Sequence, residues 1–141
     1  MNPRPRRVDV DARAGDLRTM MLREGFQHAL VIELGAVVGV ISDREVLAAL
    51  SPDADSRFAS RHELASLDKR AHQIMGRSPL TIRTDTTMTE AAALLLEHRI
   101  HCLPVFHGQR CTGTLSSGDV LRWALELARE AAAAHVAVAS R

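Results

Sequence analysis

The residue pattern with the clearest chemical potential is a serine followed three positions later by an acid, and it occurs twice. The two pairs are Ser42–Glu45 and Ser116–Asp119, each directly after a short apolar run. One interpretation is a capping box, in which the hydroxyl and the carboxylate accept hydrogen bonds from the free backbone amides where a helix begins. In the other, those amides and the hydroxyl bind a phosphate, while the carboxylate accepts hydrogen bonds from a ribose diol. The residues alone leave both interpretations open.

The histidines do not form a metal-binding pattern. His98 and His101 are three residues apart and His107 follows, but no cysteine or carboxylate set completes a ligand cage. We expect His98 in the last turn of a helix, where a cation is favourable to the helix dipole. No serine or cysteine lies in a nucleophile-elbow pattern, so the sequence gives no support to nucleophilic catalysis.

The two cysteines are predicted to be buried and unpaired. If a hairpin turns at Gly108–Gln109, Cys111 faces Phe106, four residues from Cys102. At ~3.3 Å per residue the cysteines are then roughly 13 Å apart, whereas a disulfide needs Cα atoms within about 7 Å. Both are expected to be small apolar core residues.

The chain contains an internal repeat. A shift of 74 residues aligns 8–50 with 82–124 without a gap. Apolar residues align with apolar residues throughout, and glycine, serine and acid coincide in one short stretch. The identical pairs are Asp11/Asp85, Leu22/Leu96, Val31/Val105, Gly39/Gly113, Ser42/Ser116, Val46/Val120 and Leu47/Leu121. We infer two copies of one ancestral unit.

Each copy predicts the order strand, helix, strand, strand, helix. Apolar patterns mark a first strand at 8–10 and 80–82, and hairpins at 29–41 and 103–115 with turns at Leu34–Gly35 and Gly108–Gln109. A second helix follows each motif serine. Helical spacing predicts first-helix faces that contain Leu17, Met20 and Met21 in one copy and Ala91, Leu94 and Leu95 in the other.

The first helices differ in how they begin. Thr87 and Glu90 form a capping box at the start of the helix in the second copy. Arg13 stands at the equivalent position in the first copy, and its side chain offers no acceptor for a free amide. We therefore expect a weaker helix start there.

The predicted organisation is a basic arm at 1–7, a repeat at 8–50, a linker at 51–79, a repeat at 80–127 and an alanine-rich tail at 128–141. In the linker, a loop is followed by residues at helical spacing that predict one amphipathic helix: Leu64, Leu67, Ala71 and Ile74. The tail is expected to extend the last helix before it frays.

Length and composition exclude several classes of protein. The 141 residues, 46% hydrophobic and 25% charged, suit one compact folded unit rather than a disordered chain. A net charge of +1 argues against binding to nucleic acid or to an anionic membrane. No apolar run approaches the ~20 residues of a transmembrane helix, and the basic start does not lead into a signal peptide. With two cysteines only, a cytoplasmic location is expected.

Two stretches carry a resemblance to a known family. They are Gly39-Val-Ile-Ser42-Asp-Arg-Glu45-Val-Leu47 and Gly113-Thr-Leu-Ser116-Ser-Gly-Asp119-Val-Leu121, each preceded by a predicted hairpin. The second copy adds Ile74–Ile82 and Ile100–Val105. In this order, over about residues 8–127, the sequence resembles a tandem cystathionine-β-synthase (CBS) domain pair, or Bateman module.

The resemblance implies an α/β (α+β) fold of two β-α-β-β-α repeats with pseudo-twofold symmetry, joined by the helical linker. Such modules are not enzymes and commonly regulate an enzyme or transporter. Many members hold adenine nucleotides in clefts between the two repeats, and they usually pair into a flat dimer.

The resemblance also assigns roles to the motif residues. The hydroxyl of Ser116 would contact phosphate and Asp119 would contact ribose, an interpretation we favour because Gly118 leaves room for a sugar. In the first copy Glu45 is one methylene longer than the family's usual aspartate, and Arg44 replaces the glycine. Arg44 either fills the pocket or pairs with a phosphate, so this site is either occupied or vestigial.

An apolar slot for adenine is implied at the first strand and at the start of the second. The positions, which core packing explains as well, are Thr81, Ile82, Ile100, Cys102, Leu103 and Pro104, with Val8, His28, Ala29 and Leu30 in the first copy.

The leading hypothesis is a stand-alone, non-catalytic sensor that requires no cofactor. AMP, ADP, ATP or S-adenosylmethionine would enter the cleft and change a surface that a homodimer presents to an unidentified target protein. The alternative is a ligand-free dimeric interaction module in which the motifs only cap helices. A third hypothesis, nucleic-acid binding through the arm at 1–7, rests on three arginines.

Overall fold

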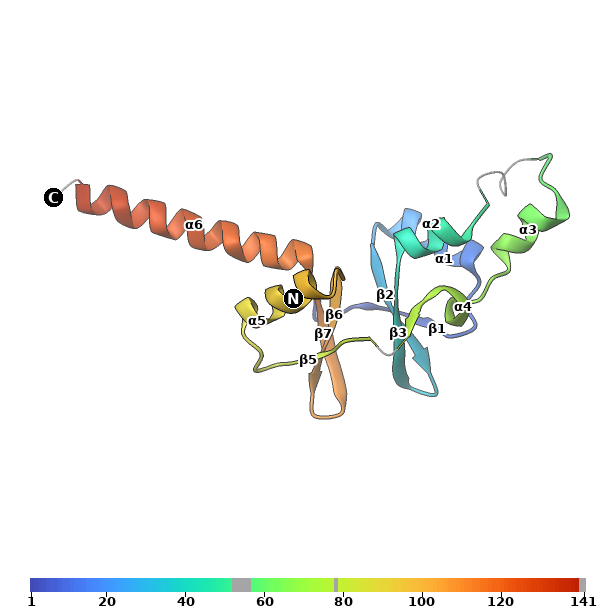
Figure 1. The fold of residues 1–141 in the computed structure, drawn as a ribbon, viewed down its shortest axis with the longest axis horizontal. Coiled ribbons are helices and arrows are strands. Elements are labelled where there is room, and N and C mark those ends of the chain that lie inside the picture. The colour runs from blue at the N-terminus through green and yellow to red at the C-terminus, as the bar shows by residue number, and fades with distance from the viewer. Residues whose placement is uncertain (52–56, 78, 140–141) are drawn as a thin grey trace. The chain divides into compact units, whose positions relative to one another are not determined.

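Strands and helices are interspersed along the chain (Figure 1). The computed structural model describes residues 1–51, 57–77 and 79–139, with the backbone alone for 135–139. The elements in chain order are β1 (Arg6–Asp9), α1 (Ala14–Glu24), β2 (His28–Glu33), β3 (Ala36–Ser42), α2 (Asp43–Ala49), α3 (Arg61–Leu67), α4 (Ala71–Ile74), β4 (Gly76–Arg77), β5 (Ile82–Arg83), α5 (Met88–Glu97), β6 (Cys102–His107), β7 (Arg110–Ser116) and α6 (Ser117–Ala139).

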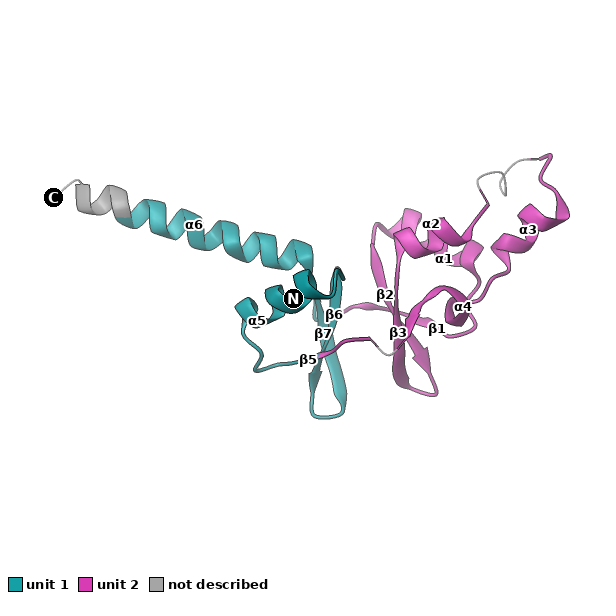
Figure 2. Ribbon diagram, in the orientation of Figure 1, with its two compact units in different colours: residues 1–3, 82–141 teal, residues 4–81 magenta. Residues whose placement is uncertain are grey.

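The chain forms two compact units, drawn in different colours in Figure 2. Unit 2 contains residues 4–81, and unit 1 contains residues 1–3 and 82–141. Each copy of the repeat builds a sheet of its own. The mixed α+β class and the order strand, helix, strand, strand, helix in each copy are confirmed.

The sheet of unit 2 has the strand order β1-β2-β3-β4. β1 is parallel to β2, β2 and β3 form an antiparallel hairpin, and β4 pairs with the outer edge of β3. The hairpin turns at Leu34–Gly35, as predicted. Both residues have positive φ, 47° and 83°, because a two-residue turn of this hand matches the twist of the flanking strands.

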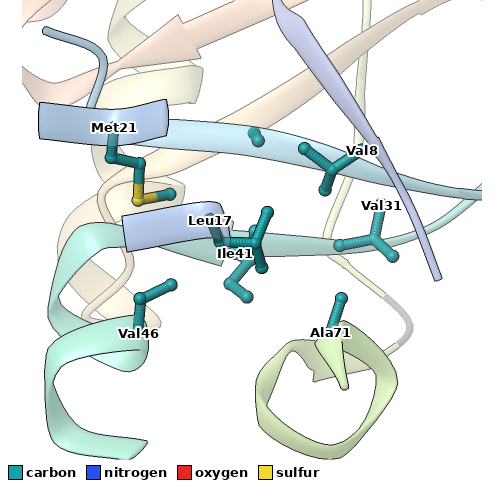
Figure 3. Packing of buried hydrophobic residues seen from close by; sticks show 8 residues of the cluster. Val8, Leu17, Met21, Val31, Ile41, Val46 and Ala71 are labelled. Atoms are coloured by element: carbon teal, nitrogen blue, oxygen red, sulfur yellow. The ribbon is translucent and has the colours of Figure 1, made fainter. Parts of the chain in front are cut away.

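The apolar core of unit 2 lies between its sheet and its helices. Leu17 and Met21, one helical turn apart on α1, pack with Val31 of β2 and Ile41 of β3 (Figure 3). Val46 of α2 and the small Ala71 of α4 complete the labelled cluster, together with Val8 of β1. The helical face predicted on α1 is confirmed, since Met20 is partly buried against this core as well.

The linker forms two short helices rather than the single amphipathic helix that its spacing predicts. α3 ends at Leu67 and α4 begins at Ala71 because the backbone between them bonds elsewhere. The Lys69 carbonyl accepts a hydrogen bond from the Ala14 N–H at 2.8 Å, and the Ala71 N–H donates to the Ala12 carbonyl at 2.8 Å. These bonds attach the linker to the start of α1 within unit 2. Most of the predicted loop, at 52–56, lies outside the described residues.

The sheet of unit 1 has the strand order β5-β6-β7. β5 is parallel to β6, and β6 and β7 form an antiparallel hairpin that turns at Gly108–Gln109, as predicted. α5 packs through Ala91 and Leu95, which are buried, while Leu94 is half-buried. Both units therefore present the same local arrangement of hairpin and first helix.

The two first helices begin as predicted. The side chain of Thr87 accepts from the Glu90 N–H, and Glu90 accepts from the Thr87 N–H at 2.9 Å, which completes the capping box of α5. Arg13 precedes α1 without a side-chain cap. The first turn of α1 consequently lacks the local bonds that hold α5.

α6 is largely exposed beyond its first turns. Side chains at 124–134 are exposed, and the helix continues past residue 127 to Ala139. The helix carries charges of both signs at Arg122, Glu126 and Arg129. In the part of the chain that the structure describes, no helix combines the length and apolarity needed to cross a membrane.

Candidate functional site

The motif of unit 1 lies where β7 ends and α6 begins. Asp119 Oδ2 accepts from the Ser116 N–H at 2.9 Å and from Ser116 Oγ at 2.9 Å. Ser116 Oγ in turn accepts from the Asp119 N–H at 3.2 Å. The two side chains therefore form a complete capping box at the start of α6.

The second oxygen of Asp119 faces two cations. Asp119 Oδ1 lies 3.4 Å from the Met1 amine and 3.2 Å from Arg122 Nη1, and the side chain is 15% exposed. Burial alone would raise the pKa of Asp119, but hydrogen bonds from Ser116 and the positive amine outweigh it, so the pKa is lowered. Asp119 is thus an ionised acceptor at neutral pH, in the first turn of a helix, where the helix dipole favours a negative charge.

The motif of unit 2 has the same geometry at the junction of β3 and α2. Glu45 Oε2 accepts from the Ser42 N–H at 2.6 Å and from Ser42 Oγ at 2.9 Å, and Ser42 Oγ accepts from the Glu45 N–H at 3.3 Å. The extra methylene of Glu45 does not prevent the capping box. Arg44 between them is exposed.

Each motif adjoins the start of the first hairpin strand of its unit, β2 or β6. Ser42 pairs with His28, and Ser116 pairs with Cys102. The residue after each motif serine bonds to the residue before that strand. The Asp43 N–H donates to the Gln27 carbonyl at 2.9 Å, and the Ser117 N–H donates to the His101 carbonyl at 3.0 Å.

A polar pair beside the motif of unit 1 was not predicted from the Ser-x-x-acid pattern. His101 Nδ1 lies 3.2 Å from Ser117 Oγ, and the imidazole is exposed. The repeat offset could have identified both positions, because it aligns His101 with Gln27 and Ser117 with Asp43.

The positions implied for an adenine slot are mostly core residues within their own units. Val8, Ala29, Leu30, Ile82, Cys102, Leu103 and Pro104 are buried, His28 and Ile100 are half-buried, and Thr81 is exposed. Thr81 belongs to unit 2, whereas Ile82 belongs to unit 1.

The cysteines and histidines behave as core and surface residues. Cys102 and Cys111 are free and buried, and Cys111 pairs with Phe106 across the hairpin, as predicted. Burial raises the pKa of Cys102 to about 12. His98 caps the C-terminal end of α5. Within the described ranges, no group of three histidine, cysteine or acidic residues is placed to hold a metal ion.

The first residues of the chain lie beside the unit 1 motif. The Asn2 N–H donates to Thr114 at 2.8 Å, and the Thr114 N–H donates back at 3.0 Å. A Cβ on Gly113 would lie 2.6 Å from the Asn2 carbonyl oxygen, so only glycine fits there. The predicted basic arm is not a free segment, since Arg6 also lies in β1 and pairs with Glu24.

Unit 2 contains the equivalent contact. β4 pairs with β3 through Gly76 and Val40, the residues that the 74-residue offset aligns with Asn2 and Thr114. A Cβ on Gly39 would lie 2.9 Å from the Gly76 carbonyl oxygen. The repeat therefore extends to residues before position 8. In the sequence, the match of Met1 with Met75 at the same offset indicates this extension.

Comparisons with known proteins agree with this geometry. The chain is 35% identical over 112 residues to the chloroplastic CBS domain-containing protein CBSX2 of Arabidopsis thaliana, covering 67% of this chain and 47% of that protein. It spans less than half the length of the curated relatives that it matches.

Two solved structures are similar in fold. One is CBSX2 in complex with AMP, with a TM-score of 0.71, 29% identity and coverage of 90% of this chain and 93% of that one. The other is the CBS domain pair of protein MJ0100 in complex with 5-methylthioadenosine and S-adenosyl-L-methionine, with a TM-score of 0.68, 20% identity and coverage of 86% and 92%. The family model for the CBS domain matches residues 1–52 and 71–126. With the repeated sheet, helices and motifs described above, the chain therefore belongs to the CBS domain family as a tandem pair.

Proposed function

We propose that this protein is a non-catalytic regulatory module that binds an adenosine ligand at Ser116–Asp119 and transmits its occupancy to a target protein. The observation that carries the proposal is the motif at the junction of β7 and α6. It combines a hydroxyl, an ionised carboxylate and the amides of a helix N-terminus within one turn. No cofactor is required for such a role.

The chemistry of the motif suits a nucleotide. A ribose diol donates two hydrogen bonds, and the ionised Asp119 offers only acceptors. Phosphate oxygens accept from hydroxyls and from amides at a helix start. The relative CBSX2, whose structure contains AMP, makes AMP the first ligand to test, followed by ADP, ATP and S-adenosylmethionine.

The motif of unit 2 is the second candidate position. Ser42 and Glu45 offer the same groups, and the exposed Arg44 supplies a cation that can pair with a phosphate. The alternative is a vestigial site in which Arg44 occupies the space of the ligand. Comparison of Glu45→Ala with Asp119→Ala distinguishes these possibilities.

The test is a thermal-shift and calorimetric titration with the four adenosine compounds. A ligand that binds only the folded state raises the melting temperature, and Asp119→Ala should abolish most of that rise. Glu90→Ala is the matched control, because it also removes the acid of a capping box but lies at the start of α5. Glu90→Ala should lower the stability of the protein while leaving the ligand-induced rise in melting temperature unchanged. A wild-type protein that responds to none of the compounds would exclude nucleotide sensing.

A ligand-free interaction module is the competing function, and exposed leucines favour it. Leu22 and Leu47 are 75% and 57% exposed in unit 2, and their repeat counterparts Leu96 and Leu121 are 80% and 70% exposed in unit 1. Apolar side chains repeated at equivalent exposed positions of both units indicate a surface that another protein covers. The homodimer that we expect would use a second copy of this chain for that purpose, and it is compatible with either function.

A cytoplasmic location completes the proposal. Both thiols are free and buried, which is compatible with a reducing compartment. Fractionation of cells that express the tagged protein tests this location.

A further inference from the structure

Each motif acid lies beside a backbone segment that leads into the first strand of the other unit. Residues 1–3 belong to unit 1 and continue into unit 2, whose first strand begins at Arg6. In the same way, β4 belongs to unit 2 and continues into unit 1, whose first strand begins at Ile82. The chain therefore passes between the units twice, each time from an edge pairing.

In unit 1 the segment 1–3 covers Asp119. The Met1 amine lies 3.4 Å from Asp119 Oδ1, and Asn2 is bonded in both directions to Thr114, two residues before Ser116. Asp119 Oδ2 already accepts twice from Ser116. A ribose diol that binds Asp119 would therefore use Oδ1, the oxygen that faces both Met1 and Arg122.

Unit 2 repeats this arrangement. A Cβ on Gly76 would lie 3.9 Å from Glu45 Oε1, so β4 adjoins the acid of that motif as well. β4 pairs with β3 at two positions, whereas segment 1–3 pairs with β7 at Asn2 alone. The proximity of an edge segment to the acid is thus a property of the repeat.

We propose that segment 1–3 is a displaceable edge segment that competes with the ligand for Asp119 and releases the entry to β1 when the ligand binds. This inference rests on the proposed function of the Ser116–Asp119 site. The contacts that attach the segment include two backbone hydrogen bonds and one partly exposed ion pair, each of modest net strength, which a ligand can replace. Met1 and Asn2 are both exposed, so the segment can leave without opening the core.

The competition has a defined consequence for binding. The ligand prefers the state in which segment 1–3 is undocked. The apparent affinity is therefore the intrinsic affinity multiplied by the fraction of protein in that undocked state. Release of residues 1–3 also removes the attachment of the chain just before β1. Ligand binding in unit 1 thereby removes a restraint on the residues that enter β1, the first strand of unit 2, because the two are covalently connected.

Gly113→Ala tests the proposal directly. The three heavy atoms nearest to a Cβ at this position all belong to Met1 and Asn2, so the substitution displaces the segment. We expect AMP to bind roughly fivefold more tightly than to the wild type in calorimetry, because the competing state is removed. Arg110→Ala, an exposed position at the hairpin end of β7, is the matched control and should bind as the wild type does.

Hydrogen exchange supplies a readout besides affinity. Saturating AMP should accelerate exchange of the Thr114 N–H in the wild type, since this group donates to the Asn2 carbonyl. If Gly113→Ala fails to fold, Asn2→Pro removes the other bond of the pair and should tighten AMP binding in the same direction. AMP binding with unchanged Thr114 exchange and equal affinities would overturn this inference and leave the proposed function in place. Absence of AMP binding in the wild type and in every variant would exclude both.

Discussion

Gly25 and Arg99 occupy the same left-handed position after the first helix of each unit, with φ of 69° and 53°. The Gly25 N–H donates to Met21 at 2.9 Å, which closes the end of α1. Arg99 stands 74 residues later in the sequence and adopts this conformation with a Cβ, which costs energy that glycine avoids. The two copies therefore share a backbone conformation, and only one of them has glycine, the residue best suited to it, at this position.

Arg99→Gly should stabilise unit 1 by about 0.5–1 kcal/mol. The gain is the removal of left-handed strain, reduced by the larger conformational entropy of glycine in the unfolded chain. Urea unfolding measures it, and Gly25→Ala is the reciprocal variant, expected to destabilise unit 2. Equal stability of Arg99→Gly and wild type would show that the conformation is not strained.

Gly39→Ala should destabilise unit 2 by about 1–3 kcal/mol. The new Cβ would contact the side chain of Met75 and lie 2.9 Å from the Gly76 carbonyl oxygen, so β4 must move away from β3. Gly76→Ala is the matched control in the same strand pair, because its Cβ meets no atom closer than 3.8 Å. Urea unfolding that finds the two variants equally stable would contradict the close approach of β4.

Asp119 should contribute stability that disappears in acid. Its pKa in the folded protein is lowered, so the contribution is complete above the unfolded-state value of about 3.9 and is lost as the pH falls through the folded-state value. Asp119→Asn should cost about 1 kcal/mol at neutral pH, the usual size of a lost helix cap. Urea unfolding across the acid range should show the difference between variant and wild type shrinking below about pH 4. A difference that is independent of pH would contradict this origin.

Cys102 should resist alkylation in the folded protein. Burial raises the pKa of this thiol to about 12, so the reactive thiolate is scarce at mildly alkaline pH. Iodoacetamide labelling followed by peptide mass analysis should modify Cys102 slowly in native protein and rapidly in concentrated guanidinium chloride. Cys111→Ser simplifies the measurement to one thiol. Rapid native labelling would show that the start of β6 is open to solvent.

The exposed leucines should hold the expected homodimer together. Leu47→Gln combined with Leu121→Gln removes a repeated pair of apolar side chains that are 57% and 70% exposed. We expect sedimentation analysis to show a shift from dimer to monomer with the melting temperature of the units little changed, because neither side chain is in a core. Leu34→Gln, at a fully exposed hairpin turn, is the control that should leave the dimer intact. An unchanged dimer in the double variant would place the interface elsewhere.

Local patterns in the sequence determined much of this protein. The 74-residue repeat, the hairpin turns and the capping boxes all depend on residues a few positions apart, and such contacts form whenever the right side chains have the right spacing. The absence of a side-chain cap at Arg13 follows from the same logic. The Ser116–Asp119 pair could be identified for this reason, and its spacing was compatible with a cap and with a ligand site alike.

Tertiary structure decided the contacts between distant parts of the chain. The linker spacing predicted one helix, but backbone bonds from Lys69 and Ala71 to the start of α1 divide it into two. The pairing of Asn2 with Thr114 and the position of Met1 beside Asp119 likewise join residues from opposite ends of the sequence. Hydrogen bonds of this kind depend on which strand edge is free once each sheet has formed, a property of the topology that no local pattern of residues records.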